Sequence, residues 1–143
     1  MAAGALRVVL DTNVLVSLFV FADSRLASLR RRLEAGEWRA LTRDDCLAEF
    51  KRVLAYPQFG LDAPAQERAF AAYASLAERV VRLPSVRVPL PQCKDGDDQK
   101  FLELARDGAA ELLVTSDKAL LRLARRGRLA GLFRIVTPEA VLA

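Results

Sequence analysis

Two apolar stretches of this chain each run directly into an aspartate. Residues 8–10 (Val-Val-Leu) lead into Asp11, and residues 112–116 lead into Asp117. A carboxylate at the end of a buried strand is costly unless its charge is compensated, and a divalent cation is the natural compensation. Either aspartate alone is explained equally well as a helix N-cap. If the two strands are parallel neighbours, both carboxylates reach one edge of the sheet, and this coincidence favours a metal site.

Two further acids are candidates for the same site. Glu49 lies next to Phe50, near the buried stripe of a predicted helix, although a surface glutamate paired with a neighbouring lysine or arginine would give the same pattern. Asp98 stands at the start of another predicted helix, where an acid also suits the helix dipole. Asp95 and Asp97 compete with it, and a solvated loop or a cap accounts for at least two of these three.

The absence of histidine narrows the chemistry more than any residue present. It excludes a Ser-His-Asp triad, a Cys-His pair and a two-histidine ribonuclease mechanism. Zinc is disfavoured as well, because only the two separated cysteines, Cys46 and Cys93, are available. Catalysis would have to use carboxylates, lysine, cysteine or a metal ion with oxygen ligands.

The elements that position these acids alternate between strands and helices. This order predicts an α/β fold, a three-layer α/β/α sandwich with a mainly parallel central sheet, as one domain over residues 1–143. Glycines 36 and 108 are expected to end helices, and Thr42 is expected to begin a capping box. Strands are predicted at 6–10, 38–41, 79–83, 112–115 and 133–136, and helices at 14–21, 24–35, 42–54, 64–78, 97–106, 116–126 and from 137.

Composition indicates a globular protein. The chain has 143 residues, 52% hydrophobic and 28% charged, which suits one domain with a proper core. No apolar run reaches the roughly 18 residues that cross a bilayer, and the first residues lack the pattern of a signal peptide. We therefore expect a cytoplasmic protein without membrane contact. Its two cysteines are expected as free thiols, with a disulfide as the alternative.

The net charge of +4 comes mainly from clustered arginines. Such clusters are either solvated helix faces or a rim that contacts phosphates. The candidates for such phosphate contacts are Arg25, Arg30, Arg122 and Arg125.

Four blocks together resemble the PIN-domain ribonuclease family, and most closely its branch of toxin components of toxin–antitoxin pairs. The blocks are VLDTNVLVS at 9–17, LAEFKRVL at 47–54, DDQKFLELA at 97–105 and LVTSDKALL at 113–121. They occur in the order and spacing of the family and span nearly the whole chain. The resemblance makes Asp11, Glu49, Asp98 and Asp117 the catalytic and metal-binding acids. Its polar positions supporting them are Thr12, Asn13, Thr115 and Ser116.

The third acid is assigned by the spacing of the helix that follows it. Asp98 places Phe101, Leu102 and Ala105 at the inward positions of the family's helix, whereas Asp97 would need a shift of one residue.

The resemblance implies a metal-dependent endoribonuclease. Mg²⁺ or Mn²⁺ would activate water and offset the charge of the phosphate, whereas four carboxylates without a metal would raise one another's pKa. RNA is the implied substrate, and a small antitoxin and a homodimer are the implied protein partners. A haloacid-dehalogenase-like phosphatase is disfavoured because its second aspartate is replaced by Asn13. A catalytically silent PIN fold that binds RNA or assembles complexes is the remaining alternative.

Overall fold

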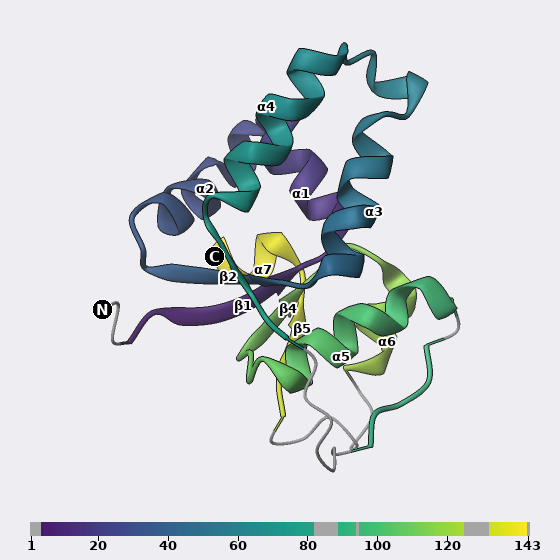
Figure 1. Cartoon of the computed structure of the whole chain (residues 1–143). Coiled ribbons are helices and arrows are strands. Elements are labelled where there is room, and N and C mark those ends of the chain that lie inside the picture. The colour runs from purple at the N-terminus through teal and green to yellow at the C-terminus, as the bar shows by residue number, and fades with distance from the viewer. Residues whose placement is uncertain (1–3, 82–88, 94, 125–131, 143) are drawn as a thin grey trace.

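A five-stranded parallel sheet forms the centre of the computed structural model, which describes residues 4–81, 89–93, 95–124 and 132–142 (Figure 1). Its strand order is β3-β2-β1-β4-β5, and all four neighbouring pairs run parallel. The predicted fold class is confirmed. The strands are β1 (Leu6–Leu10), β2 (Trp38–Thr42), β3 (Ala77–Arg79), β4 (Leu112–Val114) and β5 (Arg134–Val136).

Helices cover both faces of this sheet (Figure 1). Because strand side chains alternate between the faces, Val8 and Leu10 enter one core cluster and Val9 enters the other. The first face packs against α1 (Thr12–Phe19), α2 (Ala27–Glu34), α3 (Asp44–Leu54), α4 (Ala63–Ala74) and α7 (Pro138–Leu142). The second face packs against α5 (Gln99–Asp107) and α6 (Lys118–Leu123).

Strands β2 and β3 lie on one side of β1, and β4 and β5 lie on its other side, so the order of the strands reverses at β1. In parallel sheets, ligand sites lie beyond the carboxyl ends of the strands at such a reversal of strand order. Leu10 of β1 pairs with Val114 of β4, so that the next residues, Asp11 and Thr115, stand side by side at this point.

Some predicted boundaries were wrong. Thr42 is the last residue of β2 and does not cap α3, which begins after Arg43 without a side-chain cap. The fourth helix ends at Ala74, and the strand after it starts at Ala77, two residues before the predicted position. The predicted end of that strand and most of the proline-rich segment lie outside the described residues.

Within the described ranges, no single helix is long and apolar enough to cross a membrane. One bent pair, α1 with Ser24–Glu34, passes a test of length and composition. Its apolar side chains, among them Leu15, Leu18 and Leu29, are buried in the core.

Candidate active site

The four acids predicted from the sequence line one pocket of about 150 Å³. Asp11 follows β1, Glu49 comes from α3, Asp98 ends the short 3-10 helix η3 (Gly96–Asp98), and Asp117 precedes α6. Four separate chain segments therefore meet at the carboxyl edge of the sheet. The remaining lining residues are Thr12, Asn13, Val53 and Phe101.

Asp11 is almost completely buried, with 4% of its surface exposed. One carboxylate oxygen, Oδ1, accepts a hydrogen bond from the Val14 amide at 3.0 Å, and the other accepts one from the Thr115 hydroxyl. Burial raises the pKa of Asp11 to about 6, and the charges of Asp117 and Glu49 add to the rise. The residue thus caps α1 and at the same time presents a poorly solvated carboxylate to the pocket.

Asp98 and Asp117 form a hydrogen-bonded pair of carboxyl groups. Burial, followed by the hydrogen bond and charge of Asp117, raises the pKa of Asp98 to about 7. Asp117 itself is fixed because it accepts a hydrogen bond from the Ala119 amide at 2.9 Å, while its own amide donates to the Thr115 hydroxyl at 3.0 Å. Two carboxyl groups in contact need either a proton or a cation between them.

The structure separates the neighbouring candidates for the third acid. Asp98 is half-buried and lines the pocket, whereas Asp97 and Asp95 are exposed. Asp95 accepts a hydrogen bond from the Asp97 amide at 3.0 Å and so caps η3. Of these three aspartates, only Asp98 is among the described residues that line the pocket, and its role as the third acid stays a prediction.

Glu49 differs from the three aspartates because a lysine neutralises it. The Lys100 ammonium lies 2.9 Å from its Oε1, and the Thr12 hydroxyl donates to its Oε2. Sequence reasoning did not single out Lys100, although it lies in the block at 97–105. No local pattern could have predicted this ion pair, because Glu49 and Lys100 are 51 positions apart in the sequence. Their helices, α3 and α5, come into contact only in the folded chain.

The predicted supporting residues divide into two groups. Thr12 and Thr115 donate hydrogen bonds to the carboxylates of Glu49 and Asp11. Asn13 lines the pocket and is exposed. Ser116 is exposed as well, but it is not among the described residues that line the pocket.

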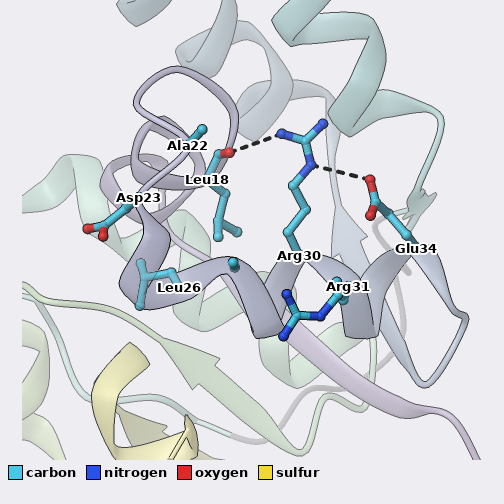
Figure 2. Close-up of a pocket in the computed structure, with 8 residues that line it drawn as sticks. Leu18, Ala22, Asp23, Leu26, Arg30, Arg31 and Glu34 are labelled. Carbon is cyan, nitrogen blue, oxygen red and sulfur yellow. Dashed lines mark hydrogen bonds and ion pairs between the residues drawn. The ribbon is translucent and has the colours of Figure 1, made fainter.

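Two of the four candidate arginines, Arg25 and Arg30, lie near the C-terminal end of α1 and make local contacts. Figure 2 shows those of Arg30. Arg30 donates to the Leu18 carbonyl at 3.2 Å and pairs with Glu34 at 3.3 Å, beside a cavity of about 210 Å³. Arg25 pairs with Asp23 at 2.9 Å and is otherwise exposed. Leu18 is six residues beyond the start of α1 at Thr12, about 9 Å along a helix axis, so Arg30 is not part of the acidic pocket.

Of the other two candidate arginines, Arg122 and Arg125, the structure describes only the first. Arg122 lies in the last turn of α6 and is exposed, whereas Arg125 falls outside the described residues. Contact of these arginines with RNA stays a prediction.

The donors in the pocket are of the type that a hard divalent cation prefers, because all four acids offer oxygen ligands. Three of them, Asp11, Asp98 and Asp117, converge without a lysine or arginine partner among the described residues. Their charges therefore fit a bound cation. Across the same residues, no three acidic side chains already stand in a coordinating arrangement. The carboxylate oxygens of Asp11 and Glu49 are instead occupied by hydrogen bonds.

Comparison with known proteins gives one match. A family model described as PIN domain matches residues 7–119, a span that includes all four acids. No curated protein and no solved structure matches the chain. The matched span covers most of the 143 residues and agrees with the parallel α/β sheet. This chain belongs to the PIN-domain family, whose members have a nuclease-type fold and are generally metal-dependent ribonucleases.

Proposed function

We propose that this protein is a metal-dependent endoribonuclease that hydrolyses phosphodiester bonds in RNA. The observation that carries the proposal is the convergence of Asp11, Glu49, Asp98 and Asp117 in one pocket at the point where strand order reverses. Membership of the PIN-domain family supports the same activity. The acids are otherwise hard to explain, because burying carboxylates next to one another lowers stability.

Asp11, Asp98 and Asp117 are the residues that would hold Mg²⁺ or Mn²⁺. When bound, such an ion supplies activation of water and relief of negative charge on the phosphate. The protein contributes fixed geometry: Thr115 and the Val14 amide hold the carboxylate of Asp11 in one orientation. Substitution of these supports would therefore weaken metal binding without removing a ligand.

The apolar wall of the pocket has a separate task. Val53 and Phe101 line it beside the acids. Apolar walls keep bulk water from the acids, and electrostatic interactions are stronger where water is excluded.

We further propose that the protein is the toxin of a toxin–antitoxin pair, acts in the cytoplasm as a single domain over residues 1–143, and binds a small antitoxin. The likeness of the four sequence blocks to that branch supports this role. If the role is correct, expression of the protein arrests growth, co-expression of its antitoxin restores growth, and the Asp11→Asn variant has no effect on growth. Normal growth during expression of the unaltered protein would contradict the role.

Cleavage of single-stranded RNA by purified protein with Mn²⁺ tests the nuclease activity. We expect cleavage that EDTA abolishes and that Asp11→Asn reduces by at least about 100-fold, since even supporting residues of metal sites contribute about 10- to 100-fold. Asp11 also caps α1, so a matched control must make the same substitution at a helix cap that lies away from the pocket. Asp62→Asn is that control, because Asp62 caps α4 by accepting from the Ala65 amide at 2.9 Å.

Loss of cleavage in Asp11→Asn also excludes a contaminating ribonuclease, whose activity would persist in every variant. Equal cleavage by the unaltered protein and by Asp11→Asn would overturn the proposal. That result would favour a PIN fold that binds RNA without cutting it, an alternative consistent with the occupied carboxylate oxygens of Asp11 and Glu49.

A further inference from the structure

One positive charge, the Lys100 ammonium, is paired with an acid of the pocket. Lys100 and Glu49 have only 14% of each side chain exposed, and their charged atoms lie 2.9 Å apart. Ion pairs buried to this degree are held by geometry, because each partner would be costly to leave alone. Across the part of the chain that the structure describes, none of the three aspartates has such a partner.

Lys100 is fixed from several directions. Its ammonium also donates to the Asp97 carbonyl, and it lies 5.0 Å from the centre of the Phe101 ring, which itself lines the pocket. These contacts place the charge at the beginning of α5, directly after Asp98. The ammonium is therefore held between α3 and α5, in contact with two residues that line the pocket, Glu49 and Phe101.

Both carboxylate oxygens of Glu49 already accept hydrogen bonds. Its Oε1 accepts from Lys100 and its Oε2 accepts from the Thr12 hydroxyl. In two-metal nuclease sites the ions lie about 3.5–4 Å apart and each needs carboxylate ligands. An ion beside Glu49 would have to displace the lysine, and it would experience repulsion from that ammonium as well as from the first ion.

We propose that Lys100 serves as the second cation of the active site, so that the pocket binds a single divalent ion on its aspartate side. Lys100 neutralises Glu49, and the ion neutralises Asp11, Asp98 and Asp117. This inference rests on the proposed metal-dependent function. It divides the four acids into a ligand group of three and one glutamate that positions a lysine.

The number of Mn²⁺ ions bound at saturation tests the inference. Isothermal titration calorimetry, with free Mn²⁺ counted by electron paramagnetic resonance, is applied to the unaltered protein and to Lys100→Met. Methionine keeps an unbranched apolar stem against Phe101 and removes the charge. We expect one ion in the unaltered protein and two in Lys100→Met, the second ion binding at the released Glu49.

Two further variants serve as controls. Lys51→Met removes an exposed lysine two positions after Glu49 on α3 and is expected to leave the count at one. Lys100→Arg keeps the charge and is also expected to bind one ion. If Lys100→Met does not fold, Lys100→Gln removes the charge with a polar side chain and is judged by the same count.

The outcomes separate this inference from the proposed function. No bound Mn²⁺ in the unaltered protein would overturn the metal-dependent function and the inference with it. One ion in the unaltered protein and an unchanged single ion in Lys100→Met would overturn the inference alone. Two ions in the unaltered protein would also overturn it while leaving the nuclease proposal standing.

Discussion

At the scale of single residues, Asp11 shows that a helix cap and a site acid need not be alternatives. The sequence left both roles open for it. In the structure one carboxylate oxygen caps α1 through the Val14 amide, and the residue still lines the acidic pocket. The cap sets the direction of the side chain, because a carboxylate held by its own helix cannot rotate away from the pocket.

The pair of Asp98 and Asp117 makes stability depend on pH. The pKa of Asp98 rises from 3.8 to about 7 on folding, so the folded chain holds this proton more tightly than the unfolded chain. The resulting stabilisation is complete below about pH 4 and is lost as the pH rises through 7. Asn at position 98 never ionises and avoids that loss.

We therefore expect Asp98→Asn to raise the melting temperature of the metal-free protein at pH 8 and to leave it nearly unchanged at pH 4. Thermal melting in EDTA at the two pH values measures the difference. An equal effect at both values would indicate that packing of the new side chain, and not ionisation, is responsible.

The acids that line the pocket could be picked out from the sequence, but Lys100 could not. Asp11 and Asp117 follow apolar strands, a pattern visible along the chain, and Asp98 precedes a helix with clear periodicity. Lys100 acquires its meaning only from the packing of α5 beside α3, which brings it to Glu49. Such contacts between distant helices leave no local signal.

At the scale of elements, Gly108 ends α5 as predicted but for a different reason. Its φ is −90°, and it is Ala109 that takes the left-handed conformation, with φ 53°. A Cβ at Gly108 would lie 2.8 Å from the Cδ1 atom of Leu41 and 3.2 Å from a methyl of Val80. The glycine is needed because the end of α5 lies so close to the sheet.

Substitution of this glycine tests the close approach. Gly108→Ala should lower the free energy of unfolding by about 1–3 kcal/mol, the usual cost of overpacking a filled core. Gly96→Ala is the matched control, since a Cβ there would meet no atom within 4 Å. Urea denaturation of both variants gives the comparison, and equal effects would show that space at Gly108 is not the cause.

The helices and strands were predicted more accurately than the residues at which they begin and end. The central strand Leu6–Leu10 agrees with its prediction because a nearly continuous apolar run is typical of a strand buried on both faces. Thr42 misled the prediction of α3, because a threonine that closes a buried strand looks the same as one that opens a helix. The choice depends on pairing with β1 and β3, which is a property of the sheet.

At the scale of the whole molecule, both cysteines are enclosed by the same core cluster, on the face covered by α5 and α6. They are free thiols, as predicted. Burial raises the pKa of Cys46 to about 12 and that of Cys93 to about 11. Since only the thiolate reacts readily, both should be inert in the folded protein.

Reaction with a thiol-specific disulfide reagent at pH 8 should therefore report unfolding of the molecule. We expect negligible modification of the native protein and modification of two thiols per chain in denaturant. Fast reaction of one thiol under native conditions would show that its part of the core opens separately from the rest.

The position of β1 between β2 and β4 also affects the order in which the site is assembled during synthesis. A nascent chain cannot complete the pocket before β4 has paired with β1. A chain that stops before β4 therefore lacks the finished pocket, although it already carries Asp11, Glu49 and Asp98.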